Sequence, residues 1–566
     1  MKPDIRWQAL LALVGLALAA MLLSYQVQSA ALCTTTVPAA GGTFIEGMVG
    51  RPLALNPLLS DPYPIDRELV GLLFDGLVRE EADGSLAPAL AESWAYSEDG
   101  LTLTFTLRDG LAWHDGEPVT ARDVAFTYGL MQSDDFPGPA ELIPLWQSVT
   151  ITVIDDRHIQ FTLAQPYAPF IEATTRGILP AHLLGGIEPA DLDSIAFNAA
   201  PIGTGPFMVQ PGQDWQQSGR LRLTPNPVDW REGTLLSDIE FRFFATADEL
   251  LAAFRNGEIH AANNLPPTLA PDVLTAEGAR LFSSPAQRYT ALFFNLGDTG
   301  TPAVRSKEVR QALAYGLDRS ALIASVLNGQ GVAFEGPYLP GSWAARPGLM
   351  TAYSYQPETA AALLDTAGWP FGDGGRFRDG GLLTLRLVAV DQPESRAVAQ
   401  EIARQWAALG IDTPVTLLSD AESLRAALDS GEFDVALLDV VPPADPDLYD
   451  FWSQEAIIRG HNYGSWNNRR ASEALEAARQ LVPQAERAVY YEAFLRQFDA
   501  DLPALTLYQH VTNYVLSDAV QAAEIGRLQE PRDRFATLPA WFLSFREVPV
   551  NCPAATSTAG VTPAGD

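Results

Sequence analysis

The chain has 566 residues, of which 47% are hydrophobic and 19% are charged, and its formal net charge is -32. This length predicts at least two domains with enough apolar material for packed cores. The negative charge disfavours nucleic acids and anionic membrane surfaces as partners, because their phosphates would be repelled.

The N-terminal segment is apolar and follows two cations. Lys2 and Arg6 precede residues 7–27, which carry no charge, and this pattern predicts a membrane-targeting segment. Three interpretations stay open: a signal peptide cleaved after the small residues at 29–31, a retained membrane anchor, or a lipoprotein attached through Cys33, against which the bulky Leu32 before it argues. All three place the body of the protein outside the cytoplasmic membrane, in the periplasm or at the cell surface.

The two cysteines, Cys33 and Cys552, stand near opposite ends of the chain. Their spacing excludes a CxxC metal or redox motif. They are a candidate disulfide that would join the two ends in an oxidising compartment, and two unpaired thiols are the alternative.

The stretch 87–128 carries the most specific local signals. Residues 101–107 alternate apolar and polar side chains, which predicts a strand, and Asp99-Gly100 before it predicts a tight hairpin turn. Thr120, followed by Asp123, predicts a capping box that opens a helix. This stretch has no obvious catalytic group and is expected to be structural, away from any ligand.

Further elements follow in chain order. Residues 149–153 and 158–163 alternate at period two and predict a second antiparallel hairpin. The Gly-Thr-Gly at 203–205 predicts a turn into a strand, since no phosphate-loop Lys follows it. Residues 238–244 and 247–254 predict a β-α unit.

The second half of the chain predicts alternating strands and helices. A strand is expected near 291–296 and a helix over 309–319, followed by units that favour a partly parallel sheet. The expected elements are helix 355–369, strand 383–390, helix 395–409, strand 414–418, helix 421–430, strand 433–440, two helices in 471–498 around Pro483, and strand 506–511.

Several of these segments resemble one protein family. Glu-Ser-Trp at 92–94, His-Asp-Gly at 114–116, Thr-Ala-Arg-Asp-Val at 120–124 and Val-Arg-Gln-Ala-Leu-Ala-Tyr at 309–315 are similar to signatures of solute-binding protein family 5. This family comprises the substrate-binding receptors of peptide- and nickel-type ABC transporters, including the oligopeptide- and dipeptide-binding receptors.

The resemblance implies an α/β fold: the two-lobed periplasmic-binding-protein type II fold with mixed sheets. The first lobe is expected to be discontinuous and to carry an inserted antiparallel subdomain. The expected divisions are signal peptide or anchor 1–31, linker 32–42, first lobe 43–84, inserted subdomain 85–199, first lobe 200–286, second lobe 287–505, first-lobe return 506–548 and disordered tail 549–566.

The resemblance also implies where a ligand would lie. Peptide-binding members pair the ligand backbone with strand-like segments of both lobes. These segments correspond to Asp61 and Tyr63 in the first lobe and to Asp439, Val440 and Val441 in the second. Trp343 is a candidate stacking surface.

One position departs from the family pattern. Peptide receptors hold the ligand ammonium with an Asp three residues before an acidic-Pro turn, and here that position is Pro442. Proline offers neither charge nor an N–H. Asp439, Asp445 or Asp447 could take over this role, and Asp445 is included among the predicted ligand-binding residues.

The sequence contains no HExxH, Gly-x-Ser-x-Gly or P-loop motif, so we expect a binding protein and not an enzyme, with no cofactor and no metal. The resemblance implies a monomeric receptor that captures a small, peptide-like solute and delivers it to an ABC permease with its ATPase, with contact to the membrane only through the N-terminal segment. A nickel-chelate or oligosaccharide receptor, a non-transport sensory module and an acidic extracellular hydrolase are the alternatives.

Overall fold

One mixed sheet of eleven strands runs through both lobes of the protein, as the computed structural model shows for residues 4–29, 33–81, 84–231 and 233–550. Along the sheet the strands are β19 (Val415–Leu418), β18 (Leu387–Val390), β20 (Val435–Val440), β13 (Ala279–Phe294), β21 (Ala504–Ser517), β12 (Ala261–Ala262), β2 (Thr43–Val49), β11 (Asp238–Phe244), β10 (Arg220–Pro225) and β9 (Phe207–Val209), and β14 (Gly331–Val332) pairs with β21 outside this path.

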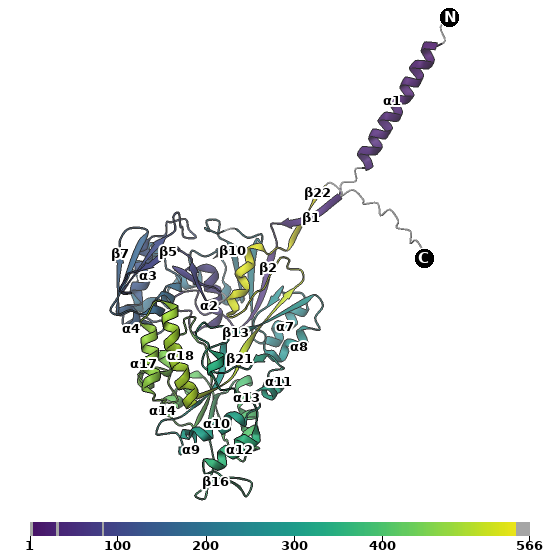
Figure 1. Cartoon of the computed structure of the whole chain (residues 1–566). Helices are drawn as coiled ribbons and strands as arrows, with labels where there is room; N and C mark the ends of the chain where they lie inside the picture. The colour runs from purple at the N-terminus through teal and green to yellow at the C-terminus, as the bar shows by residue number, and fades with distance from the viewer. Residues whose placement is uncertain (1–3, 30–32, 82–83, 232, 551–566) are drawn as a thin grey trace, which may run out of the picture.

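Two long strands, β13 and β21, connect the lobes (Figure 1). They have 16 and 14 residues and pair antiparallel from Ala279 opposite Ser517 to Phe293 opposite Ala504. The register shifts between Pro285 and Tyr289, where proline cannot donate to the ladder. Such an irregularity bends a strand locally, so the connection is a pair of strands with a bend near its middle.

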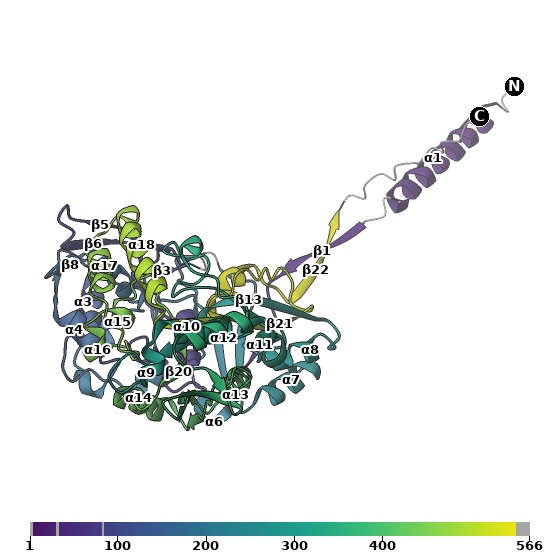
Figure 2. The same ribbon diagram turned by 60° about the horizontal axis from the view of Figure 1, so that its bottom comes forward.

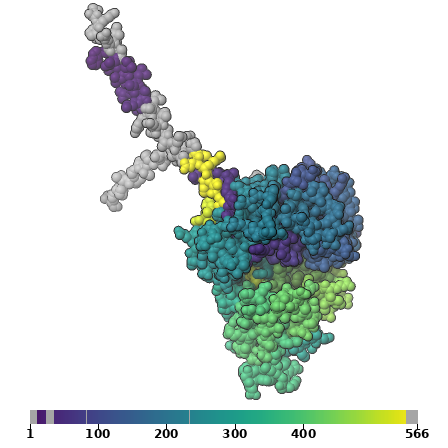
Figure 3. All heavy atoms as spheres, turned by 180° about the vertical axis from the view of Figure 1, so that it is seen from behind, coloured from purple at the N-terminus to yellow at the C-terminus, as the bar shows by residue number. Residues whose placement is uncertain are grey.

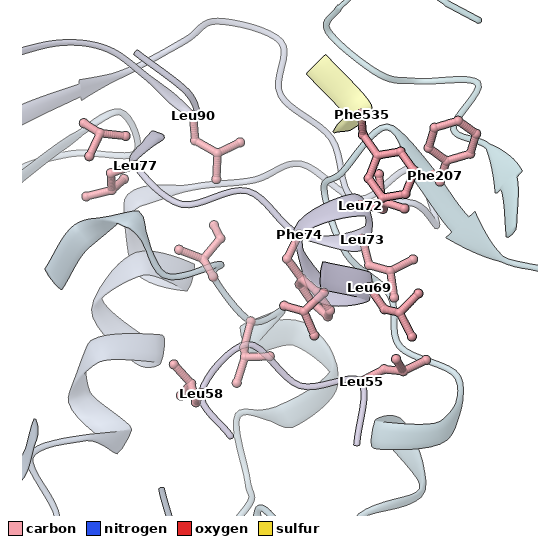
Figure 4. Packing of buried hydrophobic residues seen from close by; sticks show 14 of the residues in the cluster. Leu55, Leu58, Leu69, Leu72, Leu73, Phe74, Leu77, Leu90, Phe207 and Phe535 are labelled. Carbon is pink, nitrogen blue, oxygen red and sulfur yellow. The ribbon is translucent and has the colours of Figure 1, made fainter. Parts of the chain in front are cut away.

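The first lobe packs helices on β2 and its neighbours. β2 is parallel to β11 and β12, and α2 (Pro64–Leu73) and α7 (Ala247–Arg255) cover this part of the sheet. Figure 4 shows Leu69, Leu72 and Leu73 of α2 packed together with Phe207 and Phe535. The last of these comes from η6 (Pro531–Ala540), so the chain returns to the first lobe at its end, as expected.

The Gly-Thr-Gly turn is a strand entry, as predicted, and it packs against α2. A Cβ on Gly203 would lie 1.9 Å from the Leu73 carbonyl oxygen, so only glycine fits there. His114 holds the same turn: its Nδ1 accepts a hydrogen bond from the Gly203 N–H at 3.0 Å, and its Nε2 lies 3.1 Å from the Gly205 oxygen. Burial lowers the pKa of His114 to about 4, so it is neutral in this position.

The inserted subdomain is a four-stranded antiparallel sheet, in agreement with the prediction. Its order is β5 (Ala91–Tyr96), β6 (Thr102–Leu107), β8 (His158–Leu163) and β7 (Val149–Val153). The predicted capping box is present: Thr120 and Asp123 exchange hydrogen bonds at the start of α3 (Ala121–Leu130). The insert shares one continuous hydrophobic cluster with the rest of the first lobe.

The second lobe contains parallel β-α units. β18 pairs parallel with both β19 and β20, and α13 (Pro393–Ala407) and α14 (Ala421–Ser430) are their connections. The predicted helix over 309–319 is too long, because α10 (Lys307–Tyr315) ends before Gly316. Asp318 instead caps the next helix, α11 (Arg319–Val326).

A helical hairpin of the second lobe reaches the insert. α17 (Arg469–Arg479) and α18 (Gln484–Asp501) are joined at Pro483, as predicted, and Arg479 of α17 lies over the ring of Tyr167 in the insert (Figures 1 and 2 show the hairpin). The space-filling view shows the first lobe above and the second below, in contact with each other (Figure 3). The predicted two-lobed α/β fold is confirmed.

The N-terminal helix stands apart from this body. α1 (Asp4–Ser29) projects from it, and between them β1 (Cys33–Ala39) pairs antiparallel with β22 (Ser544–Val550) (Figures 1 and 2). The linker expected at 32–42 therefore contains a paired strand. Among the described residues, no helix combines the length and the hydropathy that crossing a membrane requires.

The predicted disulfide involves Cys552, which lies outside the described residues, as do residues 551–566 of the predicted tail. The tail was predicted to begin at 549, but β22 extends to Val550 and its last two residues pair with Thr34 and Cys33, so that boundary is two residues too early.

Candidate functional site: a cleft between the lobes

A cleft of about 620 Å³ lies between the two lobes. On the first-lobe side it is lined by residues around β4 (Leu86–Pro88), by β5 and by η1 (Ala168–Thr175). On the second-lobe side it is lined by residues 338–343, by residues 442–446 after β20 and by the start of α18. Gln287 of β13 and Gln509 of β21 line it where the connecting strands pass. A change in the angle between the lobes therefore changes the shape of the cleft.

Four aromatic side chains line the cleft: Trp94, Tyr96, Tyr338 and Trp343. Trp94 and Tyr96 stand two residues apart on β5, so they share one face of the strand. The Trp343 ring lies 5.4 Å from the Tyr491 ring, which supports it from behind. The Tyr338 hydroxyl is buried and has no hydrogen-bond partner among the described residues. The walls therefore offer flat apolar surface and an unused hydroxyl.

Four glutamines also line the cleft: Gln287, Gln484, Gln509 and Gln529. Each amide can both donate and accept hydrogen bonds, so it can pair with peptide groups or with hydroxyls. The Gln509 Nε2 donates to the Ala286 carbonyl oxygen at 2.8 Å, which fixes its orientation at the bend of the connecting strands. The polar groups of the cleft are thus mostly uncharged.

The charged side chains that line the cleft are Glu172, Asp445 and Arg487. Arg487 of α18 forms a bidentate ion pair with Asp445: Nη1 donates to Oδ2 at 2.5 Å, and Nη2 donates to Oδ1. Arg487 also donates to the Tyr491 hydroxyl at 2.7 Å. Both charges of this pair are used within the protein, so Asp445 is not a free anchor for a ligand cation.

Glu172 lies on η1 of the first lobe and touches the second lobe. Its Oε1 accepts a hydrogen bond from the main-chain N–H of Asp445. Burial, and next the negative charge of Asp445, raise the pKa of Glu172 to about 8, although the Asp445 N–H acts in the opposite direction. Desolvation and like charge disfavour the ionised form, and no cation pairs with it among the described residues.

A second contact joins the lobes beside the cleft. The Arg479 guanidinium of α17 lies 4.9 Å from the ring centre of Tyr167 in the first lobe. The same guanidinium donates to Asp447 at 2.8 Å. The contacts of Arg479 and Glu172 show that the lobes are closed on each other along this edge.

Of the predicted ligand-binding residues, Trp343 and Asp445 line the cleft. Pro442 lines it too, so the residue that replaces the ammonium-binding Asp of peptide receptors faces the same space. The first-lobe residues Asp61 and Tyr63 do not line it. Asp61 pairs with Arg176 at 2.5 Å, and Tyr63, which precedes α2, is 44% exposed.

Asp439 is held by a different set of residues, and it does not line the cleft. It stands opposite Thr290 in the β13–β20 ladder, and the Thr290 hydroxyl donates to its Oδ1 at 2.6 Å. Burial would raise the pKa of Asp439, but the hydrogen bond and charge of His510, together with Arg288, hold it at about 2. Val440 is buried in the core.

Val441 follows as an exposed residue that also does not line the cleft. The structure thus brings only Trp343 and Asp445 of the seven predicted residues to this space.

Several cleft residues were not predicted. Trp94 and Tyr96 belong to the stretch that was expected to lie away from any ligand, but both line the cleft. Two aromatic positions on one strand face were the available signal. Glu172 had no comparable signal, since its partner is 273 residues away.

Comparison with known proteins identifies the family. Residues 85–456 match the family described as "Bacterial extracellular solute-binding proteins, family 5 Middle". The chain belongs to this family. It is therefore a solute-binding protein of the kind that serves ABC transporters, and members of this family are extracytoplasmic binding proteins.

Individual relatives match over most of the chain. Protein XP55 of Streptomyces lividans is 30% identical over 491 residues, which cover 85% of each chain. The oligopeptide-binding protein AppA of Bacillus subtilis is 26% identical and covers 90% of this chain and 92% of its own. The structure of NikZ from Campylobacter jejuni in complex with Ni(L-His) has a TM-score of 0.73 at 25% identity and covers 88% of this chain and 99% of its own.

Proposed function

We propose that this receptor captures a short peptide in the cleft and delivers it to the permease of an ABC importer and its ATPase. The observation that carries the proposal is the position of the cleft between two lobes that β13 and β21 connect. Closure of such lobes excludes water, so that a few polar groups and apolar walls can hold a small solute.

The cleft chemistry supports a peptide as the ligand. Glutamine amides can pair with main-chain N–H and C=O groups, and the aromatic walls can hold side chains of varied shape. Relatives of this chain carry the names oligopeptide-binding protein and dipeptide-binding protein. A solved structure with a TM-score of 0.72, AppA of Bacillus subtilis, holds a nonapeptide.

An oligosaccharide is the second candidate, because aromatic rings and amides also suit sugar rings and hydroxyls. Four rings and four glutamines line the cleft, whereas its Asp445–Arg487 pair is neutralised internally. The experiment below separates the two ligand classes.

The proposal includes the setting of the receptor. The body acts as a monomer outside the cytoplasmic membrane, and the N-terminal segment either directs its export or anchors it. No cofactor takes part in binding.

A thermal-shift comparison tests the ligand class. An equimolar tetrapeptide mixture, maltotetraose and a nickel–histidine chelate are the probes. A ligand at 100 times its Kd stabilises the folded state by about 2.7 kcal/mol, which raises the melting temperature of a chain of this size by about 2 to 3 °C. We expect this shift with the peptides only.

The matched variants are Trp343→Ala and Tyr355→Ala. Trp343 lines the cleft, whereas Tyr355 is exposed elsewhere on the second lobe. The first should lose the peptide shift, and the second should keep it. A shift with maltotetraose and none with peptides would refute the peptide and favour an oligosaccharide as the ligand. A shift with neither would also refute the proposal of a peptide.

A further inference from the structure

Glu172 differs from the other charged side chains that line the cleft. Asp445 and Arg487 neutralise each other, but Glu172 forms no ion pair with any described residue. Its Oε1 accepts the Asp445 N–H, and its Oε2 has no hydrogen-bond partner among the described residues. A carboxylate in a closed cleft that keeps one oxygen free is a strong acceptor for a cation.

The surroundings of Glu172 are predominantly negative. The charged groups that act on it are Asp445 and Glu80, which are acidic, and Arg487, which is basic. Arg487 is already engaged by Asp445, and Glu80 is engaged by Arg532 at 3.0 Å. Arg487 and Arg532 are therefore engaged by other carboxylates, and the ionised form of Glu172 has no cation of its own among the described residues.

We propose that Glu172 binds the ammonium group of the ligand, which for a peptide is its amino terminus. This inference rests on the proposed function and deepens it, because it names the chemical class that the cleft selects: a solute with a primary ammonium. The charge is supplied by the first lobe. On the second lobe, position 442 is proline and Asp445 is paired, so neither can supply it.

The proposed contact also connects binding with closure. Glu172 accepts an N–H from the second lobe through Oε1, while Oε2 receives the ammonium of the ligand. An ammonium at this place compensates the charge that burial and Asp445 make unfavourable, so the closed lobes are stabilised by the ligand. In the absence of ligand, a proton fills the same role, in keeping with the raised pKa.

The test compares two forms of one probe: an equimolar tetrapeptide mixture with free amino termini and the same mixture with acetylated amino termini. Acetylation removes the charge and keeps the rest of the peptide. We expect the free-amine mixture to bind at least tenfold more tightly in isothermal titration calorimetry at pH 7.

Two variants complete the test. Glu172→Gln keeps an oxygen that can accept the Asp445 N–H but removes the charge, so it should weaken binding of the free-amine mixture at least tenfold and leave the acetylated mixture unchanged. Glu188→Gln makes the same exchange at an exposed surface position and should change neither. If Glu172→Gln fails to fold, equal binding of the two mixtures by the unmodified protein still overturns the site.

The outcomes separate this inference from the proposed function. Equal binding of both mixtures, or unchanged binding by Glu172→Gln, overturns the ammonium site and leaves a peptide receptor. Failure of both mixtures to bind overturns the peptide function and the ammonium site with it.

Discussion

Replacing Arg534 by methionine should strongly destabilise the first lobe. This arginine of η6 is fully buried, and its Nη2 lies 2.5 Å from Glu46 Oε1 of β2. Its Nη1 lies 2.8 Å from Glu68 Oε2 of α2. Arg534 thus joins the returning end of the chain to the first strand and the first helix of the lobe, and the substitution would leave both carboxylates without their cation.

The magnitude follows from the carboxylates that remain. A buried carboxylate that loses its partner must take up a proton or stay charged in a medium of low polarity. Protonating an ordinary glutamate at pH 7.5, about three units above its pKa, costs about 4 kcal/mol. This agrees with the loss of about 3 to 5 kcal/mol that removal of one member of a buried pair causes.

Urea unfolding of Arg534→Met at pH 7.5 and at pH 5.5 measures this loss. The penalty should fall by about 1.4 kcal/mol per pH unit for each carboxyl that must be protonated, because protonation is less costly in acid. Arg527→Met, at an exposed arginine of the same returning segment, should cost less than about 0.5 kcal/mol. A loss below about 1 kcal/mol for Arg534→Met, or an equal loss at both pH values, would refute this reasoning.

Three further predictions concern the cleft. The pKa of Glu172 is raised to about 8, so folding favours its protonated form. The stability of the wild type relative to Glu172→Gln should therefore fall between pH 5 and pH 8, by at most about 1.4 kcal/mol per pH unit. An equal stability difference between the two proteins at pH 5 and pH 8 in urea unfolding would contradict this. Arg487→Met should cost about 1 to 3 kcal/mol in urea unfolding, because it leaves Asp445 unpaired, and adding Asp445→Asn should recover part of this loss. A double variant whose stability loss equals the sum of the two single losses would contradict the pairing. Trp343→Ala should weaken binding of the tetrapeptide mixture about tenfold, whereas Asp439→Asn, outside the cleft, should leave it unchanged. The reverse order in calorimetry would place the ligand at Asp439 and not in this cleft.

Local structure was predictable where neighbouring residues determine it. Thr120 and Asp123 form their capping box within four residues of chain. In strands β6 and β8 of the insert, apolar and polar residues alternate in the sequence, and buried and half-buried side chains alternate in the same way in the structure. The start of β13 was not predictable in this way. Its first ten residues include Pro285 and no regular alternation, so only their pairing with β21 defines them as a strand.

The site was less predictable, because it is made by contacts between distant segments. Strand alternation places Asp439 beside Thr290 and His510, and its neighbour Val440 in the core, but the sequence does not say which side of the sheet the cleft occupies. Glu172 stands in a short 3-10 segment without a periodic pattern, and only lobe closure brings it to Asp445. The chemistry of a cleft between lobes depends on their mutual position, which no local pattern encodes.

The ribbon of β1 and β22 determines how the folded body would respond to tension. Its strands run in opposite directions, with Cys33 opposite Val550 at the outer end and Ala39 opposite Ser544 at the inner end. A force applied between the two chain ends would load these hydrogen bonds one pair after another, as in opening a zipper, and not all at once in shear. The ribbon would thus part before the load reached the first-lobe core, so that the cleft is mechanically insulated from whatever holds the ends of the chain.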